Sequence, residues 1–114
     1  DMIINGVELE YDAYDRDLNK KIQQYLAETQ NVEKALLNET DVVVAIEKSC
    51  QPVFDFFDKV FGEGTSRKIF GDKVSLTLCM DAYEAFFAEK DRQDVEIKRR
   101  TEKMKKRITA ANKR

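Results

Sequence analysis

The sequence predicts an all-α fold, a small helical bundle with a long C-terminal helix and a short N-terminal β-hairpin. Apolar residues recur at three- and four-residue steps through most of the chain, which is the period of a helix with one buried face. From about Val74 or Ser75 to Asn112 there is neither glycine nor proline, so one last helix can run unbroken. Asn5 and Gly6 stand between short apolar runs, as in a two-residue hairpin turn.

The hairpin is predicted over residues 2–11. Val7, Leu9 and Tyr11 alternate with glutamates, so one face of the second strand is apolar. A two-stranded ribbon alone is marginal in water. The hairpin is therefore expected either to lie on the helices or to pair with another copy, which would make it an assembly edge.

The first long helix is expected to begin at Asp15 or Asp17, either of which can cap it, and to end at Asn38. The spacing of its apolar residues predicts that one helix spans the whole stretch. Its predicted buried face consists of Leu18, Ile22, Tyr25, Leu26, Val32, Leu36 and Leu37.

The central helix is expected to be capped by Thr40 or Asp41 and to end before Gly62. Pro52 lies inside this helix, where it removes one backbone hydrogen bond and crowds a carbonyl one turn earlier. We therefore expect a kink or a break near residues 49–51. The predicted apolar face consists of Val43, Ile46, Cys50, Val53, Phe57, Val60 and Phe61.

A short helix is predicted to follow, capped by Thr65 or Ser66 and closed by Gly71. The first half of the last helix then has an apolar face wide enough to pack on the core. That face consists of Leu76, Cys79, Met80, Tyr83, Phe86 and Phe87.

The end of the last helix differs from the rest of the chain. Residues 1–95 carry a net charge of −9, whereas residues 96–114 carry +7. We therefore divide the chain into a helical body of residues 1–92, hairpin included, and a basic extension of residues 93–114. A thin seam of coiled-coil type continues along the extension, too short to be stable as an isolated dimer. It consists of Ile97, Thr101, Met104, Ile108 and Ala111.

The residue types argue against catalysis and against a metal or a cofactor. The chain contains no histidine, which removes the usual general base and the commonest metal ligand. Cys50 and Cys79 are expected to be buried thiols, since two cysteines without histidine leave a structural zinc site half empty. Residues 62–68 have the wrong order for a phosphate-binding loop. Asp55 and Asp58 are interpreted as a solvated helix face.

The chain is expected to stay in the cytoplasm and off membranes. It contains no apolar run of 18 residues and shows no secretory signal at its N-terminus. Two cysteines expected to be free thiols also favour a reducing compartment.

Two groups of residues are candidates for binding other molecules. One helix cannot hide all of its phenylalanines on one face, so at least one should meet a second surface, in this chain or another. The protein-interaction candidates are Phe54, Phe56, Phe57, Phe61, Phe70, Ile97, Met104 and Ile108. The second group is the basic tail, formed by Lys98, Arg99, Arg100, Lys103, Lys105, Lys106 and Arg107.

The basic tail favours an acidic protein surface, such as the body of another copy, over nucleic acid. Its positive charges surround the helix instead of forming a stripe, and no aromatic residue for base stacking follows Phe87.

Residues Val53–Gly71 resemble the tail assembly chaperones of long-tailed phages and prophages of Gram-positive bacteria. The resemblance extends to Ile4–Val7 and to Leu78–Tyr83, and it covers most of the chain but is weak after Ala88. Its central motif is fairly distinctive, although it is a packing motif and carries no chemistry.

The resemblance implies a small helical protein that is not an enzyme and that tends to form homo-oligomers. Such chaperones bind the tape measure protein, keep it soluble, and help tail tube protein polymerise around it. They act in the host bacterial cytoplasm and are absent from the mature virion. The alternative is a phage regulator that binds nucleic acid through the basic C-terminal helix.

Overall fold

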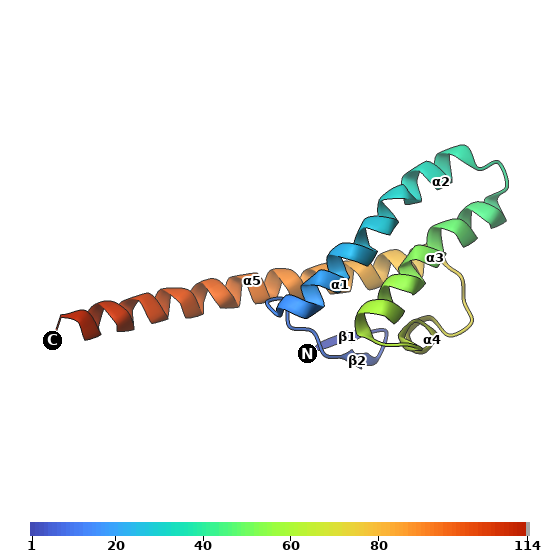
Figure 1. The fold of residues 1–114 in the computed structure, drawn as a ribbon. Coiled ribbons are helices and arrows are strands. Elements are labelled where there is room, and N and C mark those ends of the chain that lie inside the picture. Colours follow the sequence, from blue (N-terminus) through green and yellow to red (C-terminus); the bar gives the residue numbers. More distant parts are fainter. Residues whose placement is uncertain (114) are drawn as a thin grey trace.

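The computed structural model describes residues 1–113, apart from the side chain at position 31, and the chain is mostly helical. Its elements are β1 (Met2–Ile4), β2 (Val7–Leu9), α1 (Arg16–Leu26), the 3₁₀ segment η1 (Ala27–Asn31), α2 (Val32–Asn38), α3 (Val42–Phe61), α4 (Thr65–Phe70) and α5 (Leu76–Asn112) (Figure 1). The N-terminal hairpin and the long C-terminal helix are confirmed. The fold is not strictly all-α, because the two strands pair.

The hairpin turn is built as the sequence predicts. Asn5 and Gly6 have φ angles of +49° and +78°, which glycine and asparagine tolerate better than other residues. Met2 and Ile4 are buried, while Ile3 between them is exposed. Strand β1 lies against α5. This confirms the first of the two alternatives, that the hairpin lies on the helices.

The single helix predicted over residues 15–38 is wrong, because η1 separates α1 from α2. Asp15 caps α1 as predicted, its carboxylate accepting a hydrogen bond of 2.9 Å from the Leu18 amide. Within η1, the Thr29 hydroxyl donates to the Leu26 carbonyl at 2.7 Å. Such a bond to the third preceding residue offers the backbone an alternative to the α-helical ladder.

Helix α3 runs unbroken through Pro52, so the alternative of a break near residues 49–51 is wrong. Asp41 caps the helix and accepts from the Val43 amide at 2.9 Å. Proline leaves the carbonyl of Lys48 without its helical donor. Lys48 lies on the exposed side of the helix, where water can replace that donor.

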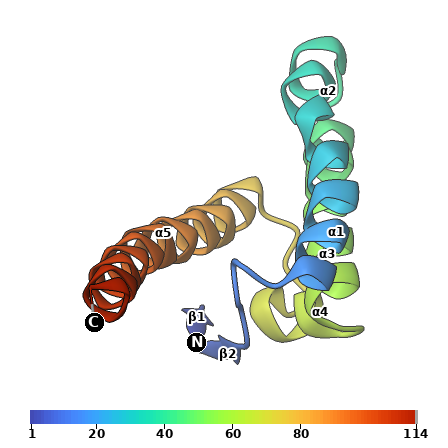
Figure 2. The same cartoon turned by 60° about the vertical axis from the view of Figure 1, so that its left-hand side comes forward.

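The outer ends of α2 and α3 carry exposed apolar side chains. Leu36, Leu37 and Val43 were all predicted to be buried, but 38%, 76% and 60% of their surfaces are exposed. The two helices extend together beyond α5 and the hairpin, as Figures 1 and 2 show. No other element of the described chain covers their outer faces there, which is why these predictions are wrong.

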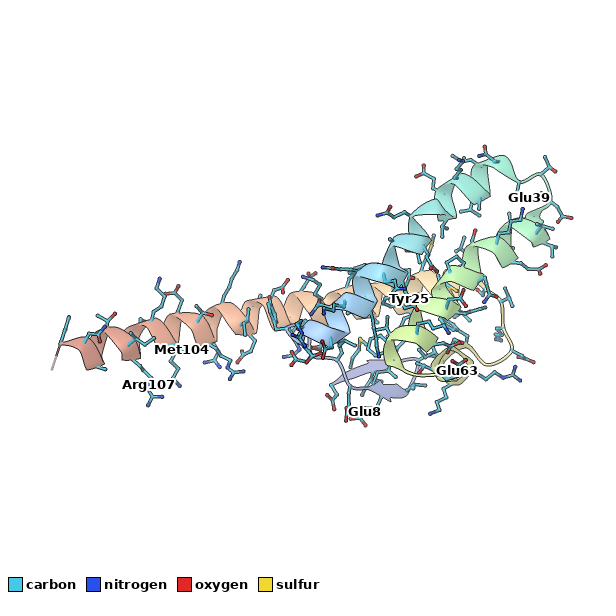
Figure 3. All side chains as sticks on the ribbon, in the orientation of Figure 1. Glu8, Tyr25, Glu39, Glu63, Met104 and Arg107 are labelled. Carbon is cyan, nitrogen blue, oxygen red and sulfur yellow. The ribbon has the colours of Figure 1, made fainter. Side chains whose placement is uncertain are left out.

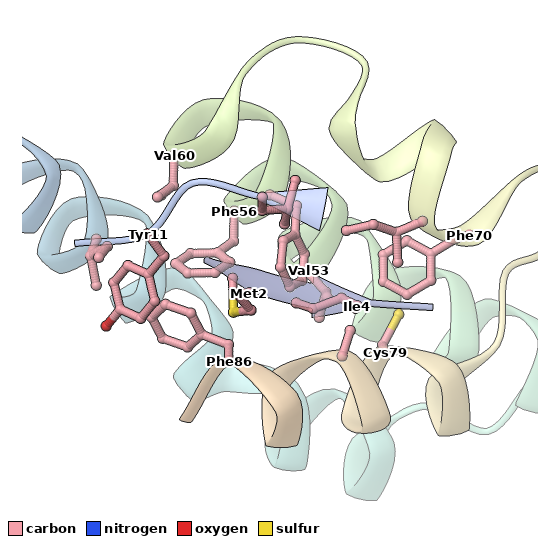
Figure 4. Close-up of a cluster of buried hydrophobic side chains, with 14 of the residues drawn as sticks. Met2, Ile4, Tyr11, Val53, Phe56, Val60, Phe70, Cys79 and Phe86 are labelled. Carbon is pink, nitrogen blue, oxygen red and sulfur yellow. The ribbon is translucent and has the colours of Figure 1, made fainter. Parts of the chain in front are cut away.

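The core brings together α3, α5 and the hairpin (Figure 4). Phe56 and Phe57 are both fully buried although they point in different directions from α3. Phe56 packs on Phe86 of α5, with ring centroids 5.3 Å apart. The second surface expected for one of these phenylalanines is therefore supplied by the same chain. Cys50 and Cys79 are free and buried, as predicted.

The corner between α3 and α4 is fixed by a side chain that the sequence analysis placed in solvent. Gly62 ends α3 with a φ of +118°, as its position predicts, but neither Thr65 nor Ser66 caps α4. Instead, the Asp58 carboxylate accepts from the Ser66 amide at 2.8 Å and from its hydroxyl at 2.9 Å. The interpretation of Asp58 as part of a solvated face is therefore wrong.

Candidate interaction surface on α5

Helix α5 consists of a packed half and a projecting half. Residues up to about position 94 face the body, whereas every residue from 98 to 113 is exposed. The projecting half extends away from the other elements, and the molecule is 70 Å long along its main axis (Figures 1 and 3). No other element of the described chain covers it.

Gln93 holds α5 to the chain that leads from the hairpin to α1. Its Oε1 accepts from the Ala13 amide at 2.8 Å, and its Nε2 donates to the Tyr11 carbonyl at 2.8 Å. The same Nε2 also donates to Glu89 at 3.0 Å. One side chain therefore satisfies two backbone groups that lie some 80 residues away in sequence.

Tyr14 adds a second attachment one residue further along, and Lys90 supports it from within α5. The Tyr14 hydroxyl donates a hydrogen bond to Asp94, and the Lys90 ammonium lies 2.9 Å from the same carboxylate. Both contacts hold the pKa of Asp94 below its usual value, and the hydrogen bond from Tyr14 is the larger cause. The attachment lies at the boundary predicted between body and extension, at residues 92–93, and that boundary stays a prediction.

Sequence reasoning did not identify Gln93 or Asp94 as structural residues. A signal for Gln93 was present, because Cys79, Phe86 and Gln93 are spaced by seven and fall on the same face of the helix. A polar residue on the continuation of a buried face needs a hydrogen-bond partner. The seven-residue spacing did not say which part of the chain would supply that partner.

The seam predicted on the extension is mostly accessible. Ile97 is half-buried beside the attachment, but Met104 and Ile108 expose 60% and 56% of their surfaces. The Thr101 hydroxyl donates to the Ile97 carbonyl at 2.8 Å. This polar residue of the seam is therefore hydrogen-bonded within its own helix. The structure therefore leaves two adjacent apolar side chains, one helical turn apart, for contact with a partner.

The five phenylalanine candidates belong to the core or its margin. Phe56, Phe57 and Phe70 are buried, and Phe54 and Phe61 are half-buried against the same cluster. They therefore hold the body together and offer little surface in this monomer. Met80 and Phe87 of α5 were predicted to pack on the core, but 50% and 41% of their surfaces are exposed, so that prediction is wrong for these two residues.

All seven residues of the basic tail are exposed. Arg99 forms an ion pair with Glu96 at 2.6 Å, and within the described chain the other six form none. Arg100 and Arg107 flank one side of the Met104–Ile108 seam, and Lys105 flanks the other. The projecting half therefore presents an apolar stripe between positive charges.

Two further observations bear on the chemistry open to residues 1–113. No group of three or more potential metal ligands comes together in this part of the chain, and none of its helices combines the length and apolar character needed to cross a membrane. Burial raises the pKa of both the Cys50 and the Cys79 thiol. Thiols of this kind are poor nucleophiles.

Comparison with known proteins identifies a sequence family only. No curated protein matches the chain, and no solved structure matches it either. A family described as a family of unknown function, DUF6673, matches residues 5–114, which is nearly the whole sequence. The chain therefore belongs to the DUF6673 family.

Proposed function

We propose that this protein is a tail assembly chaperone of a long-tailed phage or prophage, which binds tape measure protein and tail tube protein during tail assembly and associates with itself. It acts by binding and not by catalysis, in the cytoplasm of the host bacterium, and is not retained in the mature virion. The observation that carries the proposal is the projecting half of α5, which exposes an apolar stripe between positive charges.

A projecting helix suits a partner that is itself long, helical and prone to aggregate. The body, a small helical bundle in this proposal, holds α5 at Gln93 and Asp94, so a partner can contact Met104 and Ile108 without unfolding anything. The stripe is too short to pair stably by itself, so it gains from a partner helix. The positive charges keep the unoccupied stripe soluble and favour a partner with acidic flanks.

The test introduces charge into the stripe. The double variant Met104→Glu, Ile108→Glu should abolish the solubility of a co-expressed tape measure fragment and reduce self-association measured by sedimentation. Val95→Glu is the matched control, because Val95 is 70% exposed on the same helix but lies outside the stripe. Both proteins should keep the circular dichroism of the parent, since the changed residues are exposed. Equal solubilisation and self-association by the double variant and its control would contradict the proposal.

The second candidate is a nucleic-acid-binding regulator, and the observation that favours it is the set of exposed basic residues without ion pairs. Salt separates the two candidates. Binding to nucleic acid should weaken steeply as salt rises because counterions are released, whereas association through an apolar stripe should not. Retention of tape measure binding at high salt, together with loss of any DNA or RNA binding, supports the chaperone.

A further inference from the structure

Strand β1 has an outer edge that no strand of the described chain covers. The sheet has two strands, and Ile4 pairs with Val7 directly beside the two-residue turn. In such a hairpin the pair next to the turn exchanges hydrogen bonds, and the following pair does not. The amide and carbonyl of Ile3 therefore point away from β2, and they form no other backbone hydrogen bond within residues 1–113.

A small apolar pocket lies next to this edge. It has a volume of about 160 Å³, opens to solvent and is lined by residues of β1, α4 and α5, among them Ile4, Phe70, Leu78 and Ala85. A dry cavity of roughly 150 Å³ can hold a benzene molecule. The pocket is therefore large enough for one aliphatic or aromatic side chain that enters beside β1.

Within residues 1–113, the one charged residue that lines the pocket is acidic, and so is the residue that pairs with Ile3. Asp81 is the charged residue among those that line it, and its side chain is exposed. Glu8 lies directly across from Ile3 on the neighbouring strand and is also exposed. Among the described residues, no lysine or arginine lines the pocket. A positively charged occupant is therefore favoured over a neutral or an acidic one.

We propose that the edge of β1 binds an extended, positively charged segment of another protein. The segment adds a third strand beside Ile3, inserts one apolar side chain into the pocket, and brings a lysine or arginine to Asp81. Alternate residues of a strand face the same side, so the apolar residue and a base two positions away can both face α5. This is recognition by strand addition, in which backbone bonds give affinity and the pocket gives selectivity.

A second copy of this chain is a poorer occupant of the edge. Pairing β1 with β1 of another molecule would bring two copies of Asp81 and Glu8 towards each other, and like charges in close contact oppose association. This surface shares no residue with the stripe on the projecting half of α5. The proposal can therefore fail or succeed independently of the proposed function.

The first test uses a fluorescently labelled peptide, acetyl-Lys-Val-Leu-Val-Lys-amide, and measures binding to the full chain by anisotropy at low salt. Ala85→Leu fills the pocket and should weaken binding by about tenfold or more, equivalent to about 1.4 kcal/mol. Ala88→Leu, the same change one turn further along α5 and outside the pocket, should leave binding unchanged. A peptide with glutamate in place of both lysines should not bind, and Asp81→Lys should reverse this preference.

The second test measures the rate of hydrogen exchange at the Ile3 amide. If the pocket served only to stabilise the fold, adding a peptide would leave this rate unchanged. Addition of the lysine peptide should slow exchange at Ile3, and the glutamate peptide should not. Equal binding by Ala85→Leu and the parent, or an Ile3 amide that the peptide leaves unchanged, would overturn the proposal. So would a dimer whose Ile3 amide is already protected without peptide, because a second copy would then occupy the edge.

Discussion

The two halves of α5 form one continuous helix, yet they are stabilised in different ways. Residues 76–94 carry a net charge of −3 and contribute Cys79, Ala82 and Phe86 to the core. Residues 95–112 carry +5, and none of them is buried. The first half is helical because one face is packed, as in most protein helices. The second half depends on local preferences alone.

Those local preferences are favourable. The projecting half consists largely of lysine, arginine, glutamate, alanine and methionine, all good helix formers. Glu96 and Arg99, three residues apart, form an ion pair of the kind that supports an isolated helix. Because the projecting half stays helical in water without a partner, its exposed face remains available for binding. The packed half of α5 therefore contributes residues that stabilise the fold, and the projecting half contributes residues that remain free to bind.

The largest expected effect separates the two halves directly. Phe86→Ala should lower the free energy of unfolding by about 3–5 kcal/mol, because Phe86 is 1% exposed and packs on Phe56 and Tyr11. Ile108→Ala removes an apolar side chain from the projecting half and should change the free energy of unfolding by less than about 0.5 kcal/mol. Urea unfolding of both variants measures the difference. A cost for Ile108→Ala close to that for Phe86→Ala would mean that the projecting half is also packed in solution.

A smaller effect is expected at the boundary between the halves. Gln93→Ala leaves the Tyr11 carbonyl and the Ala13 amide without their partner, and it should cost about 1–3 kcal/mol. Gln24→Ala, on the exposed face of α1, is the matched control and should be nearly neutral. Chemical denaturation of the two variants gives the comparison. If both cost the same, Gln93 does not attach α5 to the body.

Most elements that depend on neighbouring residues were predicted well, although neither Thr65 nor Ser66 caps α4. The hairpin turn at Asn5 and Gly6, the caps at Asp15 and Asp41, each one of two predicted alternatives, and the end of α5 at Asn112 all follow the sequence. Each of these signals acts within about four residues of the place where it is read. The buried thiols also followed from periodicity, because their neighbours on the same helical face are apolar.

Features that depend on distant residues were missed. Asp58 accepts hydrogen bonds from the first turn of a helix that begins seven residues later, and Gln93 bonds to backbone some 80 residues earlier. Leu37 and Val43 have the spacing of buried residues, but periodicity cannot say whether a neighbouring element reaches them. The candidate surface was half predicted for the same reason. Met104 and Ile108 are exposed as a binding stripe requires, whereas the phenylalanines met partners within the chain.

The smallest expected effect is a dependence of stability on pH that arises where Tyr11 packs on the packed half of α5. Burial against Phe86, with the charges of Asp94 and Glu89 nearby, raises the pKa of Tyr11 from 10.0 to about 12. Between these values the unfolded chain loses the phenolic proton while the folded chain keeps it, so the free energy of unfolding falls as pH rises. Below pH 10 the stabilisation is fully present. Tyr11→Phe keeps the ring and removes the phenolic proton. The free energy of unfolding of the variant should match that of the parent at neutral pH and fall less steeply in alkali. Urea unfolding at a series of pH values measures both. A parent and variant that lose stability in parallel above about pH 10 would mean that Tyr11 is solvated and that α5 is held less closely at this point than its contacts indicate.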